Sequence, residues 1–193
     1  RIRNTAKFLL GNLAGFDPKQ HLLAPEKCLL LDQWAMAKTR QLHERITDAY
    51  NQYDFARVVS SLQNFCTQEM GSLYLDVTKD RLYTMQLDSH GRRSAQSAMY
   101  AIVQVLVRAL APITSFTAEE IWQLIPGEKT QSVFFANNAE LDKLLPINGQ
   151  YMQSDNAMMQ QLLAMREAVS KVLEPMRSNG EIGAALQAEV KVY

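Results

Sequence analysis

The chain has 193 residues, of which 47% are hydrophobic and 21% charged, and its 20 Lys and Arg balance its 20 Asp and Glu. This length fits one ordinary domain with a sizeable core, and the apolar share excludes a disordered chain. No apolar run approaches the roughly 18 residues that a membrane span needs, and no segment resembles a signal peptide. The two cysteines, Cys28 and Cys66, cannot form a disulfide framework and lack metal-ligand spacing. We therefore expect a soluble protein of a reducing compartment, the cytoplasm.

Both ends of the chain predict that it is a piece of a longer polypeptide. The first residues enter a helical pattern with no capping residue ahead of them. Residues 188–193 alternate like a strand that has no partner in this sequence. Because an isolated strand is not stable, we expect its partner elsewhere.

Hydrophobic periodicity predicts several long amphipathic helices. Apolar residues recur at three- and four-residue steps over 1–13, 31–53 and 55–77. Gly15 and Pro18 end the first run, and Asp54 is typical of an N-cap for the third helix. A fourth helix is predicted for 93–110, where Pro112 closes the pattern.

The second half of the chain is less regular. Thr117 and Glu120 fit a capping box that opens a short helix, which Pro126-Gly127 ends. Residues 127–152 are turn-rich, with a short strand predicted at 133–135, and a last helix is predicted for 155–179 with Gly180 as its C-cap. We expect an all-α fold, an antiparallel helical bundle with a small mixed C-terminal region, divided into a core over 1–126 and a second part over 127–193.

No familiar catalytic or metal-binding pattern is present in the sequence. The three histidines, His21, His43 and His90, lie far apart, and there is no Glu-x-x-His pair for a di-metal site in a bundle. Glycine-rich phosphate loops and the Gly-x-Ser-x-Gly elbow are also missing. We therefore expect this chain by itself to be non-catalytic and to hold no cofactor.

Basic residues are concentrated in the first part of the chain. Residues 1–109 carry 14 Lys or Arg against 10 Asp or Glu, a net charge of +4, whereas 110–193 carry 6 against 10, a net charge of −4. Such a division is typical of a surface that meets an anionic partner. Uneven solvated surface is the alternative explanation.

Two groups of these residues are candidate RNA contacts. Lys79 and Arg81 lie near the end of the third predicted helix, and Arg92 and Arg93 open the fourth, so the four should meet at one end of the bundle, with Tyr83 and His90 between them. The second group lies on the first helix and comprises Arg3, Asn4 and Lys7. Cations beside a flat ring can contact phosphates while the ring stacks on a base.

The spacing leaves other interpretations open. Arg81 and Asp80 could form ion pairs that hold helices together. The long helices could instead form a scaffold whose groove binds a protein. A free-standing metal-dependent or hydrolytic enzyme is disfavoured by the missing ligand pairs.

Several motifs occur in a characteristic order, namely Asp32-Gln33-Trp34, Tyr53-Asp54-Phe55, Lys79-Asp80-Arg81-Leu82-Tyr83, Arg92-Arg93-Ser94-Ala95-Gln96 and Ala111-Pro112-Ile113-Thr114-Ser115-Phe116-Thr117-Ala118-Glu119-Glu120-Ile121-Trp122. This set resembles the anticodon-binding domain of bacterial isoleucyl-tRNA synthetases of class I. The first motif departs from the family's Asp-Arg-Trp by a Gln. The resemblance is strong from Arg1 to about Trp122 and weaker beyond.

The resemblance implies a helical bundle that holds the anticodon arm of isoleucine tRNA, with no membrane partner. Family catalysis needs His-Ile-Gly-His-like and Lys-Met-Ser-Lys-Ser-like signatures, which this chain lacks. ATP, magnesium and isoleucine sites are therefore expected in a catalytic domain of the parent chain, and zinc in a further C-terminal domain. The RNA-binding residues that we expect here are Arg3, Asn4, Lys7, Lys79, Arg81, Arg92 and Arg93.

Overall fold

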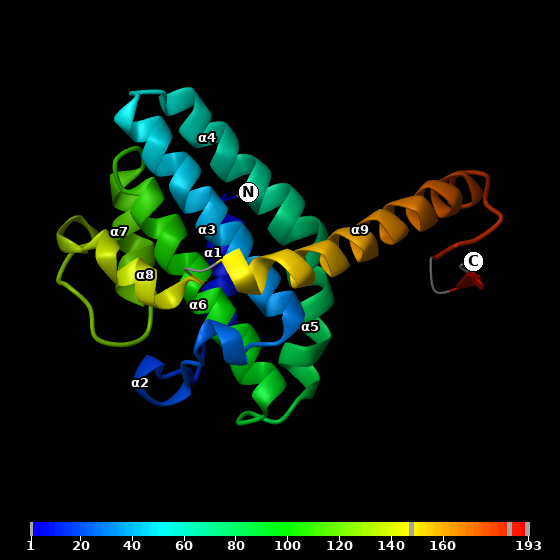
Figure 1. Cartoon of the computed structure of the whole chain (residues 1–193), viewed down its shortest axis with the longest axis horizontal. Coiled ribbons are helices and arrows are strands. Elements are labelled where there is room, and N and C mark those ends of the chain that lie inside the picture. The colour runs from blue at the N-terminus through cyan, green and yellow to red at the C-terminus, as the bar shows by residue number, and fades with distance from the viewer. Residues whose placement is uncertain (1, 147–148, 185–186, 192–193) are drawn as a thin grey trace. The chain divides into compact units, whose positions relative to one another are not determined.

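The computed structural model describes residues 2–146, 149–184 and 187–191, and only the backbone of 149–156 (Figure 1). It divides into two compact units, residues 1–151 and residues 152–193. The principal helices are α1 (Ile2–Asn12), α2 (Pro18–His21), α3 (Leu30–Asn51), α4 (Phe55–Asn64), η2 (Phe65–Tyr74), α5 (Leu75–Thr84), α6 (His90–Leu110), α7 (Ser115–Leu124), α8 (Leu141–Leu144) and α9 (Gly149–Ser178). No β-strand occurs in the described ranges, so the predicted all-α fold is confirmed.

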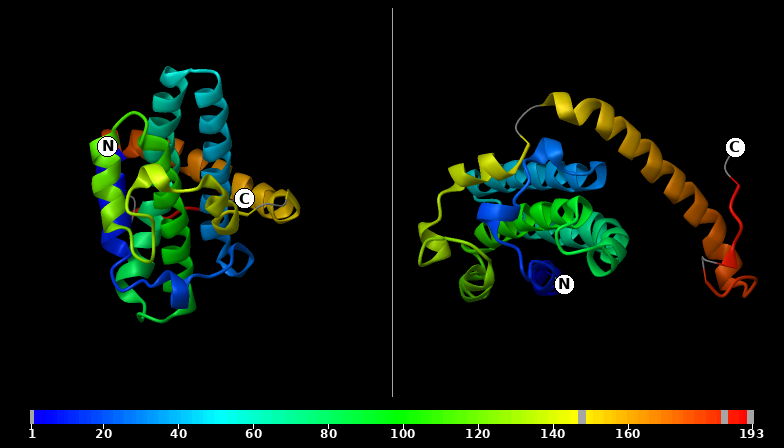
Figure 2. Two further views of the ribbon diagram at one scale, coloured as in Figure 1. Left: turned by 90° about the vertical axis from the view of Figure 1, so that its left-hand side faces the viewer. Right: turned by 90° about the horizontal axis from the view of Figure 1, so that it is seen from below.

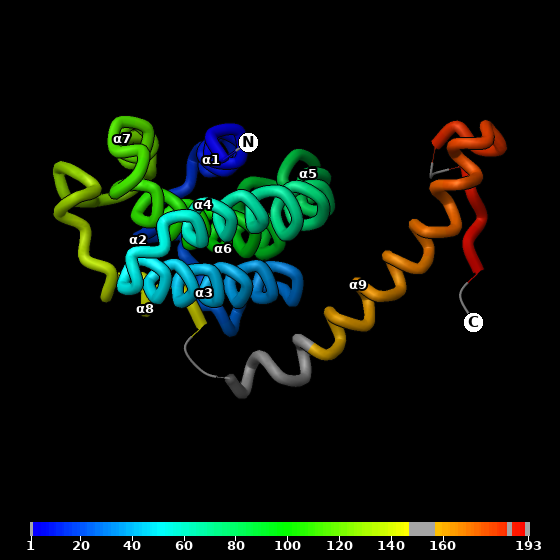
Figure 3. The backbone as a smooth tube through the Cα atoms, turned by 90° about the horizontal axis from the view of Figure 1, so that it is seen from above, coloured from blue at the N-terminus to red at the C-terminus, as the bar shows by residue number. Residues whose placement is uncertain are grey.

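The helices of the first unit lie in layers around α6 (Figure 3). On one side, α1 lies between α7 and η2 and contacts both. On the other side, α3 packs against α6 along its length and is the antiparallel neighbour of α4 (Figure 2). This arrangement covers α6 from several directions and makes it the centre of the bundle.

Helix α6 is buried almost completely because neighbours surround it. Sixteen of its residues are buried, in a nearly continuous run from Ser94 to Leu110. Three alanines, Ala95, Ala98 and Ala101, are 0% exposed and leave room for close approach of the adjacent helices. The first turn of α6, by contrast, carries His90, which is exposed.

The third predicted helix extends over three helical segments of the structure. Its predicted N-cap is confirmed, since the Arg57 backbone N–H donates to the Asp54 carboxylate at 3.0 Å. The helix then continues through α4, η2 and α5 as far as Thr84, in agreement with an end predicted around residues 79–83. Its middle segment η2 is a π-helix, whose wider turns were not predicted; within it Tyr74 is fully buried.

The strand predicted at Val133-Phe134-Phe135 is wrong, because these residues form a 3-10 turn, η3. Side chains occupy the backbone donors that a strand would need. The Glu119 carboxylate accepts from the Val133 N–H at 3.1 Å, and the Ser132 hydroxyl accepts from the Phe134 N–H at 3.3 Å. A strand is therefore replaced by a locally capped turn.

The predicted capping box is also wrong. Helix α7 begins at Ser115, two residues before Thr117, and its N-cap Thr114 makes no side-chain capping bond. Instead of reaching back to the helix start, Glu120 forms an ion pair with Arg3 of α1 at 3.1 Å. Glu120, which the local sequence pattern assigned to helix capping, therefore makes a tertiary contact with α1 instead.

The last helix agrees with its prediction at the C-terminal end. Helix α9 ends at Ser178, and Gly180 has φ 76°, the left-handed conformation of a C-cap glycine. The Glu181 N–H donates to the Met176 carbonyl at 2.9 Å across this end. Of the strand predicted at 188–193, the described residues 188–191 have no regular structure, and 192–193 lie outside the described residues. The domain boundary near residue 126 stays a prediction.

Within the described part of the chain, no helix has both the length and the apolar character needed to cross a membrane.

The end of α6 is joined to α7 and the following turns by Arg108 and Trp122. The guanidinium carbon of Arg108 lies 5.0 Å from the Trp122 ring centroid, and Nη2 of Arg108 lies 3.0 Å from Glu140. Trp122 is 1% exposed and its Nε1–H donates to the Thr130 carbonyl at 2.9 Å. The indole therefore combines a large buried area with a cation–π contact and a hydrogen bond.

Replacing this indole tests its place in the core. We expect Trp122→Ala to lower the free energy of unfolding by about 3–5 kcal/mol, because it removes buried volume and leaves Arg108 without its ring. Leu124→Ala is the matched control on the same helix, where the side chain is 65% exposed, and should change stability by less than about 0.5 kcal/mol. Urea denaturation followed by circular dichroism measures both. Equal midpoints for the two variants would contradict this assignment.

Candidate nucleic-acid interface

The seven predicted RNA-binding residues lie on three helices of the first unit. Arg3, Asn4 and Lys7 lie on α1, two more lie on α5, and the last two lie at the start of α6. The C-terminal end of α1 approaches the start of α6, since the Gln96 side chain donates to the Asn12 carbonyl at 2.9 Å. The N-terminal end of α1, which carries Arg3, lies instead against α7. The two groups are therefore distinct patches.

Arg81 is engaged by a carboxylate on α3 rather than by its neighbour Asp80. Its two terminal nitrogens donate to the two oxygens of Asp32, at 2.9 Å and 2.6 Å. The Arg81 side chain is 13% exposed and that of Asp32 is 0% exposed. This bidentate, nearly buried pair joins α5 to the start of α3.

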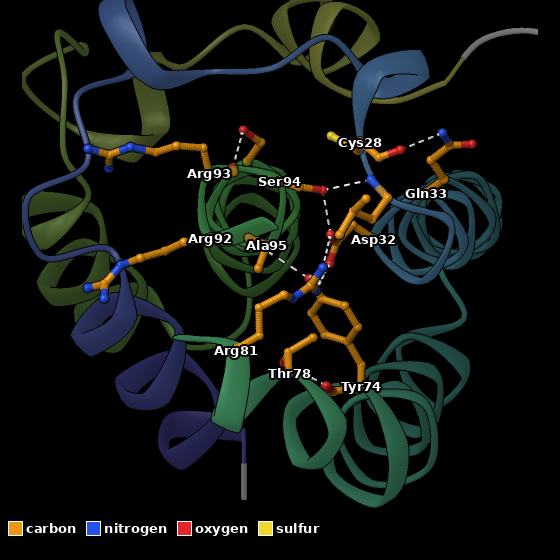
Figure 4. A network of polar contacts seen from close by, with 12 residues as sticks. Cys28, Asp32, Gln33, Tyr74, Thr78, Arg81, Arg92, Arg93, Ser94 and Ala95 are labelled. Atoms are coloured by element: carbon orange, nitrogen blue, oxygen red, sulfur yellow. Dashed lines mark hydrogen bonds and ion pairs between the residues drawn. The ribbon is translucent and has the colours of Figure 1, made fainter. Parts of the chain in front are cut away.

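Two hydroxyl groups complete the environment of Asp32 (Figure 4). Tyr74 donates to Oδ1 at 2.8 Å from η2, and Ser94 donates to Oδ2 from the second turn of α6. The Ser94 oxygen in turn accepts from the Leu29 N–H at 2.7 Å, just ahead of α3. Burial and the adjacent Asp32 carboxylate raise the pKa of Tyr74 well above its usual value, so the phenol is a neutral donor. The carboxylate thus has four donors from three elements.

Arg93 is also largely committed to internal contacts. Its side chain is 11% exposed, and Nη2 lies 2.5 Å from the Asp88 carboxylate. The same guanidinium donates to the Gly15 carbonyl at 3.3 Å and contacts His21. The bond from Arg93 lowers the pKa of Asp88. Arg93 therefore fastens the loop after α1 to the start of α6.

Arg92 differs from Arg93 because it forms no ion pair with any residue that the structure describes. Its Nη1 donates only weakly to the Met85 carbonyl, at 3.5 Å, and its buried Nε, like that of Arg93, has no hydrogen-bond partner. Figure 4 shows Arg92 and Arg93 extending from α6 away from Asp32. The charge of Arg92 is thus the less neutralised of the two.

The last turn of α5 and the segment that follows it expose aromatic and apolar side chains beside these cations. Tyr83 is 65%, Met85 43% and Leu87 64% exposed. Lys79, one helical turn before Tyr83, is exposed and pairs with Asp76 at 2.7 Å. An exposed pair of this kind contributes little stability and can exchange for another anion. We call the set Lys79, Tyr83, Met85, Leu87 and Arg92 the α5–α6 end.

The α1 residues form a smaller polar surface. Arg3 and Glu120 are 72% and 57% exposed at their side chains, so their ion pair is open to solvent. Asn4 and Lys7 are exposed. This patch offers cations without an adjacent exposed ring on α1.

Sequence reasoning named Tyr83 and His90 but missed Met85 and Leu87. The signal was available, because two apolar residues alternate with polar ones just after a helix ends, where no helical face buries them. His90 is less free than expected, since its Nε2 lies 2.8 Å from the Lys27 carbonyl.

The cysteines do not fit a metal site. Cys28 precedes α3 and Cys66 lies on η2, and burial raises the pKa of each thiol to about 11. Zinc is bound by the thiolate form. In the described ranges, no three His, Cys, Asp or Glu residues are grouped so that they could share a metal ion.

A shallow polar cleft of about 350 Å³ lies along α3, apart from the predicted residues. Its lining residues are Arg40, His43, Glu44, Thr47, Asp48, Asn51 and Asp142. Arg40 already pairs with Glu44 and Asp142. None of the seven predicted RNA-binding residues lines this cleft.

The bond from Tyr74 to Asp32 can be tested through pH. At pH 7 we expect Tyr74→Phe to lower the free energy of unfolding by about 1–3 kcal/mol, because a bond to a charged group is lost. The pKa of Tyr74 is raised in the folded state, so only the unfolded state loses this proton as pH rises above 10. The contribution of the Tyr74 hydroxyl to the free energy of unfolding is complete below pH 10 and declines above it. The difference in this free energy between Tyr74→Phe and the wild type should therefore narrow as the pH rises above 10.

Urea denaturation at about pH 7 and pH 10.5 measures this narrowing. Tyr83→Phe, at an exposed tyrosine, is the matched control and should leave stability unchanged at both pH values. A difference for Tyr74→Phe that stays constant or widens above pH 10 would contradict the assigned bond.

Comparison with known proteins matches this architecture to one family. The family model described as the anticodon-binding domain of tRNA ligase matches residues 32–192. The whole chain is 55% identical to isoleucine–tRNA ligases of Xanthomonas campestris pv. campestris (strain 8004) and Xanthomonas oryzae pv. oryzae (strain MAFF 311018), and 54% identical to that of Stenotrophomonas maltophilia (strain K279a). In each case the chain spans 20% of the relative's length. The chain therefore belongs to the family of anticodon-binding domains of tRNA ligases.

Proposed function

We propose that this chain binds the anticodon arm of isoleucine tRNA for a longer ligase whose catalytic part lies outside these residues. The identity of 55% over the whole chain to isoleucine–tRNA ligases supports isoleucine as the amino acid. The coverage of 20% of those relatives supports the presence of further domains. Within this chain, the role is to bind and orient RNA.

The observation that carries this proposal is the composition of the α5–α6 end. A cation lies on either side of three exposed non-polar side chains, with Lys79 on α5 and Arg92 on α6. The Met85 carbonyl lies against Arg92, so the turn and the second cation are adjacent. Cations contact phosphates, while a flat exposed ring such as that of Tyr83 stacks on an unpaired base. An RNA loop, with splayed bases on a folded backbone, matches both requirements.

The contribution to aminoacylation would be positional. Binding the anticodon arm at one place restricts where the acceptor end of the same tRNA can lie. This restriction raises the effective concentration of the acceptor end at a distant catalytic site. The α1 patch of Arg3, Asn4 and Lys7 is a second candidate contact along the RNA backbone.

Chemical steps belong to other parts of the proposed ligase. ATP and magnesium would be used by its catalytic domain, and zinc by a domain after this one. The two buried thiols of the present chain do not fit zinc, so no step is assigned to a metal here. The cytoplasm is the expected location, as for other components of protein synthesis.

The salt dependence of tRNA binding tests the proposed phosphate contacts. We expect Lys79→Gln and Arg92→Gln in the full-length ligase each to weaken binding of isoleucine tRNA and to lower the slope of log K against log salt by about 0.7–0.9. The reason is that a variant with one phosphate contact fewer releases fewer counterions when it binds the RNA. Filter binding between about 50 and 200 mM salt gives both quantities.

Arg45→Gln is the control for these variants. Arg45 is exposed on α3, 13 residues beyond Asp32 and therefore about 20 Å away along the helix. Its removal should leave the slope unchanged. Slopes equal to wild type for both Lys79→Gln and Arg92→Gln would refute phosphate contact at the α5–α6 end.

A stacking role for Tyr83 predicts a different signature. We expect Tyr83→Ala to weaken tRNA binding about 5- to 100-fold, corresponding to the loss of one base–ring stack, while Tyr83→Phe should bind almost as well as wild type. Tyr53→Ala is the matched control, because Tyr53 is 80% exposed at the opposite end of α3, in the α3–α4 turn. Competition binding with labelled tRNA measures all three. If Tyr83→Ala and Tyr53→Ala have the same affinity, the stacking assignment is wrong.

A further inference from the structure

The carboxylate of Asp32 lies where α5 ends and α6 begins. Arg81 is in the last turn of α5 and Ser94 is in the second turn of α6. Both residues donate to this one carboxylate, and only residues 85–89 separate the two helices. The turn that exposes Met85 and Leu87 is thus held on both sides by a single buried group.

The geometry of these bonds restricts the turn in several directions. The planar guanidinium of Arg81 meets Asp32 through two bonds, which fix orientation as well as distance. Ser94 accepts from Leu29 while it donates to Asp32, so the start of α6 is connected to the start of α3 twice. A shift of either helix end would break a bond in a site where no water can replace it, because Asp32 is 0% exposed.

Stability alone is a weak reason for this arrangement. A buried ion pair costs desolvation, and apolar side chains of similar volume can stabilise a protein as well or better. What an ionic network adds over an apolar contact is a specific geometry, since its bonds are directional. Arg81 and Ser94, which donate to this carboxylate, lie on the same two helices as the exposed Lys79 and Tyr83 and the half-buried Arg92 of the α5–α6 end.

We propose that Asp32 is a positioning residue for tRNA binding, which holds the α5–α6 end in the conformation that receives the RNA. This inference rests on the proposed function. Arg81 then acts through Asp32 and not through a phosphate. Without the carboxylate the same contacts form, but the turn must be ordered during binding, which lowers affinity.

Asp32→Asn in the full-length ligase separates the two roles of Arg81. The variant retains the side-chain shape and one of the two acceptor oxygens, replaces the other oxygen with an NH2 donor, and releases Arg81 from its ion pair. A positioning role predicts that binding of isoleucine tRNA weakens about tenfold at every salt concentration, with an unchanged salt slope. A direct phosphate contact by Arg81 predicts equal or tighter binding, because its charge becomes available.

Tyr74→Phe is the matched control, since it removes one bond to the same carboxylate from η2, ten residues before the α5 end. Its tRNA affinity should stay within about twofold of wild type. Amide hydrogen exchange of residues 85–89 should accelerate in Asp32→Asn and not in Tyr74→Phe. The concentration of binding-competent protein is determined by stoichiometric titration with tRNA, so that misfolded molecules do not alter the measured affinity.

Each result decides the question. Wild-type or tighter binding by Asp32→Asn, a lowered salt slope, or an equal loss in Tyr74→Phe would overturn the positioning role. If Asp32→Asn does not fold, Arg81→Lys, which keeps the charge and loses the bidentate geometry, should show the same tenfold loss; unchanged affinity in that variant would also overturn it. Absence of salt-dependent tRNA binding by the wild type would instead refute the proposed function itself.

Discussion

The buried carboxylate of Asp32 is the interaction on which the end of the bundle depends. Its side chain is fully enclosed, and its charge is compensated by Arg81 together with two hydroxyl donors. An unpaired carboxylate in this position would be very costly, so α3, α5 and α6 must approach one another with these groups in register. The relative position of three helix ends follows from satisfying one charge.

The central position of α6 explains why the network can have this effect. Because α6 is buried along most of its length, its direction is set by packing, and only its first turn lies outside the buried run. Ser94 lies at the boundary between the exposed and the buried part. A hydrogen bond at this boundary therefore determines how the exposed turn leaves the core.

The arginines of this chain divide by environment rather than by sequence position. Arg81, Arg93 and Arg108 are 13%, 11% and 7% exposed at their side chains, and each is paired with a carboxylate. Their guanidinium groups join helices and loops of the bundle. Lys79 is exposed, whereas Arg92 is half-buried but forms no ion pair with a described residue. Both lie beside exposed apolar side chains, where a phosphate can compete for them. Among the four candidate RNA contacts on α5 and α6, these two are the ones that no buried carboxylate engages in the described part of the chain.

The sequence by itself determined the helical class, most helix positions and the family resemblance. Periodic apolar residues and local signals such as Asp54 and Gly180 act within a few residues of chain, so they can be read without a structure. Local rules failed where distant groups intervened: Glu120 pairs with α1 instead of capping α7, and side chains occupy the backbone donors around Val133.

The candidate site shows the same limit of local sequence patterns. Sequence placed Arg81, Arg92 and Arg93 together correctly as neighbours of one turn, since a short connection joins α5 and α6. It could not distinguish a solvent-facing cation from one that pairs with Asp32, 49 residues away along the chain. Only the tertiary structure decided which charges are neutralised inside the protein, because ion pairing depends on distances in space that a helical repeat does not specify.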